Sequence, residues 1–344
     1  MAQIGTKNRK RLGLSFVSLR KVYFGFIFLA IVAYNQQFRI EAPPSLISMP
    51  ESHDSLMKHL LLTKANGWEA MPGLGIEEMM KQEKVNEEFG CNWFEFKSTR
   101  GVTAKFCGHT NGDGVSAIVE QKGHFHHCDI LPKMWDAVPN KGNASIYVEI
   151  GANIGSCVME MLLSTEAKVI AFEPNPRNQF VMKNTIAALD KSYQERFVLV
   201  PVALGKESAK NKIYTAKGNS GNSVVGKIVK DNRNQVFEES EQYDIRVESI
   251  SSIISTLPDI AFIKMDAQGF ECQILSGLDQ GLANKIRNIK FEVAKKHLRQ
   301  QGCTDLLSKF RDLGFRITDE SGRKTIEGET NQFNRMTELV AMRD

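Results

Sequence analysis

The stretch VEIGANIGSCV, Val148–Val158, decides the fold that we predict for this chain. Residues 146–150 are typical of a buried strand, and residues 154–164 have the composition of a helix. Gly151 to Gly155 form the turn between them, where glycine lets the backbone bend tightly and approach a ligand. Since ligands of open α/β sheets bind beyond the carboxyl ends of strands, this turn is a candidate binding site.

From residue 145 onward, strands and helices are expected to alternate. The predicted strands are residues 146–150, 168–172, 197–202, 244–247, 260–265, 286–293 and 315–318, with 338–342 closing the sheet. The predicted helices are residues 154–164, 177–189, 249–255, 270–276 and 304–312. This rhythm predicts an α/β fold with a mostly parallel sheet and helices on both faces. The insertion GNSGNSVVG, residues 218–226, is expected to be either a lid over an acceptor or a hairpin loop.

Two acids indicate which ligand the turn would bind. The spacing Gly-x-x-x-Gly differs from the Gly-x-Gly-x-x-Gly dinucleotide fingerprint. Glu149, directly before the turn, would repel a pyrophosphate but could accept a hydrogen bond from an ammonium group. Glu173 ends the second strand, where a carboxylate can accept both hydroxyls of a ribose. A ligand with an ammonium, a ribose and no phosphate is required, which fits S-adenosylmethionine and excludes NAD and ATP.

Five blocks of sequence, within residues 147–292, carry a resemblance to a known family. They are VEIGANIG, VIAFEPNPRNQFVMKNTIA, VLVPVALG, IAFIKMDAQGFECQILSG and IKFE. In this order and spacing they resemble the FkbM-type methyltransferases. The resemblance implies a class I, Rossmann-like methyltransferase fold, S-adenosylmethionine as cofactor, and transfer of methyl groups to hydroxyls of polyketides and sugars.

The resemblance also implies roles for individual residues. It assigns Glu149, Gly151, Ala152, Asn153 and Gly155 to the methionine end of the cofactor, Glu173 to the ribose, Pro174 and Asn175 to the adenine edge, Ala203 to the adenine, and Asp266 to the methyl and acceptor site with Glu271 nearby. Two positions depart from the family pattern. Glu149 stands where the family usually has Asp. Ser251 stands where the family often has Asp, and this second departure suggests an altered acceptor pocket.

Methyl transfer to an alcohol is helped by a general base, for which Asp266, Glu271 and His297 are candidates. Asp266 is preferred because it ends a strand at the edge where ligands bind; its alternative role is a structural helix cap. Glu271, in the first turn of the next helix, is expected to interact with the helix dipole. Lys264 is expected at the sheet edge or paired with an acid, and Glu292 is either an acceptor contact or a structural acid.

The run HFHHCD contains His124, His126, His127 and Cys128, which are residue types that bind metals. Their spacing matches no standard structural zinc pattern, so no metal is predicted. His124 and His126 would share one face of a strand, where they could line an acceptor pocket or be ordinary structural residues.

Charge and hydropathy divide the N-terminal part of the chain. Of the 44 basic residues, six lie within residues 1–21, which contain no acid, so the remaining 38 face 40 acidic residues. The body is therefore not a basic nucleic-acid binder. Residues 22–37, which begin with 13 uncharged residues up to Tyr34, are expected to be a signal anchor or a cleaved signal peptide, with a buried or amphipathic helix as a third reading.

The basic flank predicts a cytoplasmic N-terminus and a single-pass type II membrane protein facing the Golgi or ER lumen, or a secreted protein after cleavage. Residues 38–53 are a proline-containing linker. Residues 54–144 are a mixed α+β extension and candidate acceptor-side cap, with helices expected at 54–65 and 76–88 and strands at 93–97, 102–106 and 116–120. Residues 145–344 form the methyltransferase domain.

The chain has six cysteines and one glycosylation sequon, at Asn143. In the lumen, one disulfide is expected among Cys91, Cys107 and Cys128. Cys157 and Cys272 fall within predicted helices and are expected to be buried free thiols. The predicted function is O-methylation of a glycan or another secretory-pathway acceptor. The alternatives are a protein or lipid acceptor, or an inactive binding protein that keeps the fold.

Overall fold

The computed structural model describes residues 70–82, 89–110, 112–139, 141, 145–216, 219–228, 237–255, 257 and 259–343. These residues all belong to the second of two compact units, Glu51–Asp344. The predicted tail, membrane segment and linker (1–21, 22–37 and 38–53), the predicted helix 54–65 and Asn143 lie outside the described residues. Within the described ranges, no helix is long and apolar enough to span a bilayer.

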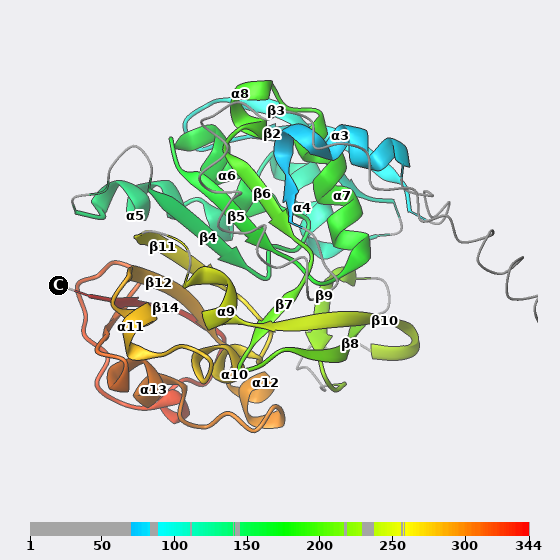
Figure 1. Ribbon diagram of the computed structural model, residues 1–344. Helices are drawn as coiled ribbons and strands as arrows, with labels where there is room; N and C mark the ends of the chain where they lie inside the picture. Colours follow the sequence, from blue (N-terminus) through cyan, green and yellow to red (C-terminus); the bar gives the residue numbers. More distant parts are fainter. Residues whose placement is uncertain are drawn as a thin grey trace, which may run out of the picture. The chain divides into compact units, whose positions relative to one another are not determined.

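An eight-stranded sheet forms the centre of this unit (Figure 1). Its strands, in spatial order, are β1 (Met71–Pro72), β6 (Phe197–Val200), β5 (Lys168–Phe172), β4 (Ile146–Ile150), β11 (Ile260–Met265), β12 (Ile286–Val293), β14 (Thr337–Met342) and β13 (Arg316–Asp319). The five strands from β6 to β12 are parallel. β1 and β14 pair antiparallel with their neighbours. The predicted mostly parallel sheet is confirmed.

Helices cover both faces of the sheet, as predicted (Figure 1). On one face lie α9 (Ile250–Ile254), α10 (Glu271–Leu275), α11 (Gln280–Ala283), α12 (Lys295–Gln300) and α13 (Leu306–Asp312). On the other lie α3 (Gly73–Gln82), α5 (Leu131–Ala137), α6 (Ser156–Ser164), α7 (Pro176–Ala187) and α8 (Lys191–Gln194). Two separate apolar cores result, one for each face.

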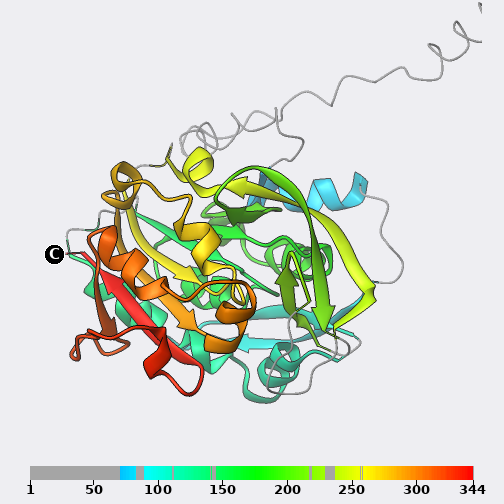
Figure 2. The same ribbon diagram turned by 90° about the horizontal axis from the view of Figure 1, so that it is seen from below.

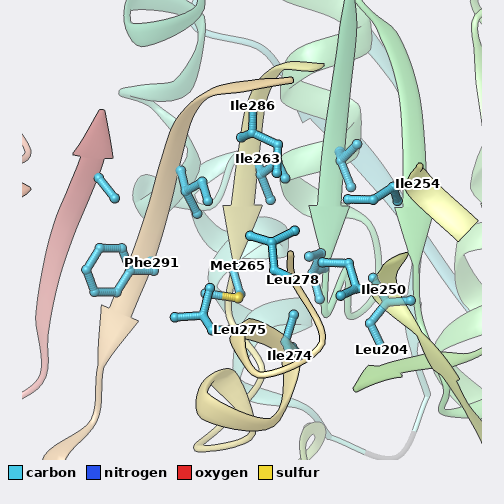
Figure 3. Packing of buried hydrophobic residues seen from close by; sticks show 14 of the residues in the cluster. Leu204, Ile250, Ile254, Ile263, Met265, Ile274, Leu275, Leu278, Ile286 and Phe291 are labelled. Carbon is cyan, nitrogen blue, oxygen red and sulfur yellow. The ribbon is translucent and has the colours of Figure 1, made fainter. Parts of the chain in front are cut away.

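The pleat of the strands sends alternate side chains into these two cores. Ile263 and Met265 of β11 and Phe291 of β12 pack against Leu275 and Leu278 on the α10 side (Figure 3). The intervening Phe262 joins the opposite core, where its ring stacks on that of Tyr147 at a centroid distance of 6.0 Å. Burial on both faces explains why these strands are almost continuously apolar.

The same alternation places charged residues on one face of β11, β12 and β14. Lys264 is paired in register with Lys290, and Glu292 with Glu338. Their neighbours along the strands, such as Ile289 and Leu339, point into the α10-side core. The opposite face is therefore polar at this end of the sheet, although Lys264, Lys290 and Glu292 are buried.

A second sheet follows the third parallel strand. It comprises β7 (Ala203–Gly205), β10 (Phe237–Ser249), β8 (Ala209–Ala216) and β9 (Asn219–Val225), in that order. Figure 2 shows the long β10 running beside β8. The described part of the insertion around residues 218–226 is strand β9, which pairs antiparallel with β8 as the second arm of a hairpin. Backbone pairing with β8 overrides the high glycine and serine content.

The N-terminal extension contains the hairpin β2 (Cys91–Lys97) and β3 (Thr103–His109), then α4 (Gly114–Lys122) and the 3-10 turn η2 (His126–Cys128). The predicted strand 116–120 is wrong, because the segment belongs to α4. Asp113 caps this helix by accepting the Ser116 N–H at 2.8 Å, and the left-handed Gly123 ends it. Such capping outweighs a short apolar alternation.

Three disulfides join Cys91 to Cys107, Cys128 to Cys157, and Cys272 to Cys303. The expectation that Cys157 and Cys272 are free thiols is therefore wrong. The N-terminal turn of α6 faces η2, and α10 faces the turn after α12, so each buried helical cysteine meets a partner far along the chain. Sequence spacing does not reveal such contacts.

A second 3-10 turn, η3 (Thr330–Gln332), precedes the last strand.

Candidate functional site

The turn after β4 is held by the ends of its neighbouring strands. The N–H groups of Gly151 and Ala152 both donate to the carbonyl of Phe172, each at 3.0 Å. The Asp266 N–H donates to the Ile150 carbonyl at 3.0 Å on the other side. Gly151 has a φ of 77°, and a Cβ there would lie 2.0 Å from the Asp266 carbonyl oxygen. Only glycine therefore allows this close approach of the two strand ends.

Asn153 continues the turn in the left-handed conformation, with φ 54°, which asparagine tolerates better than most residues. Its side-chain oxygen accepts the Ile154 N–H at 2.7 Å. Its own N–H donates to Glu173 Oε2 at 2.7 Å. The turn is thereby fixed to the acid at the end of β5.

Glu173 is buried and receives several N–H donors. Oε1 accepts the Asn175 N–H at 2.8 Å and the Asn178 amide at 3.3 Å, in addition to the Asn153 bond on Oε2. Burial raises the pKa of Glu173 to about 7, although these hydrogen bonds favour the charged form. The carboxyl group is thus oriented by the backbone and titrates close to neutral pH.

A pocket lies between the ends of β4, β5, β7 and β11, and we call it the first pocket. Its polar lining consists mainly of Gly151, Asn153, Glu173, Asn178, Asp266 and Gln268. Its apolar lining includes Pro174, Val202, Ala203, Ile213, Val225 and Phe270, from both sheets and the loop before α10. The pocket combines an apolar slot with two acids, as a ligand with a flat ring and hydroxyl groups would require.

Several residues predicted for the site lie around the first pocket. Gly151, Asn153, Glu173, Pro174, Ala203 and Asp266 line it. Ala152, Gly155 and Asn175 do not line it. Asn175 is fully buried, caps α7 by accepting the Arg177 N–H at 3.0 Å, and donates to Ser223 at 2.9 Å, which ties α7 to strand β9.

Glu149 lies beneath the turn and lines neither pocket described here. One carboxylate oxygen accepts a hydrogen bond from the Tyr147 hydroxyl, and the other lies 3.0 Å from Lys264 Nζ. Burial disfavours the charge on Lys264, but the carboxylates of Glu149 and Asp266 outweigh it and raise its pKa. Glu149 thus positions Lys264, and its contact with a ligand ammonium stays a prediction.

Asp266 occupies the end of β11 and faces open space, with its side chain 32% exposed. The Gln268 amide donates to Asp266 Oδ1 at 2.7 Å, and Lys264 Nζ lies 3.8 Å from Oδ2. Gln268 adopts a φ of 51°, which is unusual for a residue of its size. A strained residue that orients an accessible carboxylate is typical of a functional site.

Glu271 and His297, the other candidate bases, occupy different positions. Glu271 is buried below the loop before α10, where Oε1 accepts the Ala267 N–H at 2.9 Å. Burial raises the pKa of Glu271 to about 7. It lines neither pocket, whereas His297 of α12 lines the second pocket described next.

A second, adjoining pocket shares Asn153, Asp266 and Gln268 with the first. Its floor adds Lys264, Glu292 and Glu338, which come from the polar face of β11, β12 and β14. His126 and His127 of η2 and His297 of α12 also line it. The two pockets therefore meet at the Asp266 carboxylate.

The carboxyl groups on this floor differ in their environments. Burial raises the pKa of Glu292 well above its ordinary value, and the carboxylates of Asp266 and Glu338 add to the shift. Burial alone would also raise the pKa of Glu338, but hydrogen bonds from His127 and Lys290 lower it to about 2. Burial and the neighbouring carboxylates thus disfavour the charged form of Glu292, whereas Glu338 beside it is ionised at neutral pH.

His126 lies in the turn η2 and His124 in the bend before it, not on a strand, so the expected shared strand face is wrong. His127 Nδ1 lies 3.5 Å from Glu338 Oε1, and His124 Nε2 lies 3.4 Å from Asp129 Oδ2. The two side chains thus approach different acids.

Sequence reasoning missed Asn178, Gln268, Lys290 and Glu338. The signal for Lys290 and Glu338 was the alternation of charged and apolar residues in IKFEV and TELVAM. That pattern places Lys290, Glu292 and Glu338 on one face of neighbouring strands. Gln268 carries no such signal, because its role depends on its backbone conformation.

Comparisons with known proteins identify the domain. Residues 149–317 match the model of the methyltransferase FkbM domain. No match to a curated protein was found, whereas 96 chains of solved structures match. Residues 149–317 thus form an FkbM-type, S-adenosylmethionine-dependent methyltransferase domain within the α/β fold described above.

Two of the matching structures described here are methyltransferases, and a third was determined in the presence of SAH. The precorrin-6y C5,15-methyltransferase of Geobacter metallireducens is 11% identical, with 63% of this chain and 87% of that chain covered and a TM-score of 0.34. Magnesium protoporphyrin IX methyltransferase of Synechocystis PCC 6803, with bound SAM, is 12% identical, with coverages of 67% and 84% and a TM-score of 0.31. The N-terminal domain of EvdMO1, in the presence of SAH and D-fucose, is 9% identical, with coverages of 64% and 84% and a TM-score of 0.34.

The residues of the first pocket fit S-adenosylmethionine. Glu173 points a backbone-anchored carboxyl group into the pocket, which suits the two hydroxyls of a ribose. Ala203 and Ile213 offer apolar surface for a flat base, and no basic side chain lines the described part of the pocket, as a phosphate would require. Two further polar residues of the lining, Asp266 and Gln268, would lie beside the end of S-adenosylmethionine that carries the methyl group.

Proposed function

We propose that this methyltransferase transfers a methyl group from S-adenosylmethionine to a hydroxyl of a glycan in the lumen of the secretory pathway. The observation that carries the proposal is the meeting of the two pockets at Asp266. The first pocket suits the cofactor, and the second is polar enough for a hydroxyl-rich acceptor. An acceptor hydroxyl at their junction would lie beside a carboxylate.

The residues of the junction suit proton removal from an alcohol. When bound, S-adenosylmethionine supplies a methyl group on a positively charged sulfur, which keeps the C–S electron pair as the new C–O bond forms. Asp266 accepts the proton of the acceptor hydroxyl. A base in this role must lie at hydrogen-bond distance from that hydroxyl. The Gln268 amide holds one Asp266 oxygen at 2.7 Å and leaves the other toward Lys264 and the acceptor. Fixed alignment of the two substrates supplies most of the remaining rate enhancement.

The disulfides support a location in the secretory pathway. All six cysteines of the chain are paired. Disulfides persist in the secretory lumen and are rare in the cytosol. Together with the basic residues 1–21 and the apolar residues 22–34, this favours a type II protein anchored by residues 22–37, with the catalytic domain in the lumen.

Transfer of tritiated methyl groups tests the proposal. The full chain, produced in the secretory pathway, would be incubated with labelled S-adenosylmethionine and a membrane extract containing glycoproteins and lipids. We expect label that enzymatic glycan release removes, and little label with the Asp266→Asn variant. Label that stays on protein after glycan release, or that is extracted with lipids, would contradict the glycan acceptor.

A further inference from the structure

Three cationic side chains outside the floor line the second pocket. Lys295 and Lys296 begin helix α12, and Arg335 lies in the loop before β14. Lys295 Nζ donates to the backbone carbonyl of Asn331 at 2.9 Å, a contact that leaves its charge uncompensated. In the part of the chain that the structure describes, none of the three forms an ion pair with an acid.

The acids of the same pocket are engaged elsewhere. Lys290 donates a hydrogen bond to Glu338, which also lies 3.5 Å from His127. Asp266 is 3.8 Å from Lys264. Glu292 is buried, and burial together with the carboxylates of Asp266 and Glu338 raises its pKa, which disfavours its charged form. Among the described residues of the pocket, Lys295, Lys296 and Arg335 are therefore left without an acidic partner.

The pocket also has apolar lining residues. They are Val115 and Ile118 of α4, Phe125 before η2, and Met336. Met336 is 47% exposed, which is unusual for a large apolar side chain. The described lining thus combines apolar surface, carboxyl groups that can bond hydroxyls, and cationic side chains. A sugar ring could pack on the apolar residues and direct hydroxyls to the carboxyl groups.

We infer that the acceptor is an acidic sugar, a hexuronate unit of a glycan, whose carboxylate is bound by Lys295, Lys296 and Arg335 while one of its hydroxyls, or one of the adjoining sugar, reaches Asp266. This inference rests on the proposed function. Arginine and lysine both bind carboxylates through charge-assisted hydrogen bonds, and arginine can do so with two parallel bonds. A neutral glycan would leave these cations unpaired.

The test compares matched acceptors with the full chain. One set consists of hexuronate-containing oligosaccharides, and the other of the same oligosaccharides after reduction of their carboxyl groups to alcohols. We expect kcat/KM for methyl transfer to fall about tenfold or more on reduction, because two or three partly exposed ion pairs are lost. Equal rates on both sets would overturn the inference and leave the proposed function standing. No transfer to either set, with S-adenosylmethionine still bound, would overturn both.

A pair of variants locates the effect. In Lys296→Met/Arg335→Met we expect KM for the acidic oligosaccharides to rise about tenfold, with a much smaller change in KM for the reduced set and an unchanged cofactor Kd. Arg299→Met is the control, since Arg299 lies on the same helix but does not line the pocket and donates to Asn331. An unchanged KM in the double variant, or an equal rise in the control, would contradict the assignment. Thermal unfolding of each variant would identify a general loss of stability.

Discussion

At the scale of single residues, Glu173 couples cofactor binding to pH. Its pKa of about 7 in the folded protein, against an ordinary 4.5, means that the carboxyl group is largely protonated at pH 6. A ribose hydroxyl donates most strongly to the ionised form. We therefore expect the Kd for S-adenosylmethionine to improve as pH rises through 7, by about tenfold between pH 6 and pH 8. Calorimetric titration at both pH values measures this change.

The stability of the ligand-free protein should respond in the opposite sense. Because the folded pKa of Glu173 is raised, its contribution to the free energy of unfolding is complete below pH 4.5 and is lost as pH rises to 7. Glu173→Gln should bind the cofactor weakly at both pH values, so its Kd should not change with pH.

If the Kd of this variant changes with pH as much as that of the original protein, another group, such as Glu271, is responsible for the pH dependence of binding.

Glu149 and Lys264 form a buried pair whose role can be separated from ligand contact. Glu149→Gln removes the nearest partner of Lys264 and should lower the free energy of unfolding by about 3–5 kcal/mol. In Glu149→Gln/Lys264→Met the unpaired charge is absent, and most of the stability should return, with the Tyr147 hydroxyl still bonded to the amide. Chemical denaturation measures both changes. We expect this double variant to bind S-adenosylmethionine; a stable double variant that does not bind it would support a direct contact by Glu149.

At the scale of secondary-structure elements, the disulfide Cys272–Cys303 connects α10 to the turn after α12. The loop from Asp266 to Phe270, which lines both pockets, leads directly into α10. Replacing both cysteines by serine should lower the free energy of unfolding by about 3 kcal/mol. We also expect cofactor binding to weaken, because the loop loses part of its support.

Cys91→Ser/Cys107→Ser provides the matched control. This disulfide joins β2 to β3, and neither cysteine lines either pocket. Its removal should cost a similar free energy but leave the Kd for S-adenosylmethionine unchanged. Equal effects on Kd in the two variants would show that the disulfides act only through global stability.

Much of the order of elements could be predicted from the sequence, because the parallel strands are short, apolar and separated by helical segments. The strand predicted at residues 116–120 was wrong because the Asp113 side chain, three residues before Ser116, caps a helix there. Strand β9 was not predicted because its partner β8 supplies the backbone pairing that its own composition does not indicate. Of the site, the acids at strand ends could be predicted, whereas the Glu149–Lys264 pair and the Gln268 conformation depend on contacts between strands.

At the scale of the whole molecule, the proposed lumenal location of the domain is open to a direct test. A lumenal domain would expose the sequon at Asn143 to glycosylation. We expect the full chain, expressed in a eukaryotic cell, to lose apparent mass on endoglycosidase treatment. The variant Asn143→Gln should not respond. An unglycosylated chain in the membrane fraction, with free thiols, would instead favour a cytosolic domain.

The central claim is that the pocket at the ends of β4, β5, β7 and β11 binds S-adenosylmethionine. Calorimetric titration of the cofactor into three proteins tests it most directly: the original chain, Ala203→Trp and Ala209→Trp. Ala203 lines the pocket, whereas Ala209 is exposed on strand β8. We predict one binding site in the original chain and in Ala209→Trp, and binding too weak to measure in a folded Ala203→Trp. Equal affinity in all three proteins would contradict the account.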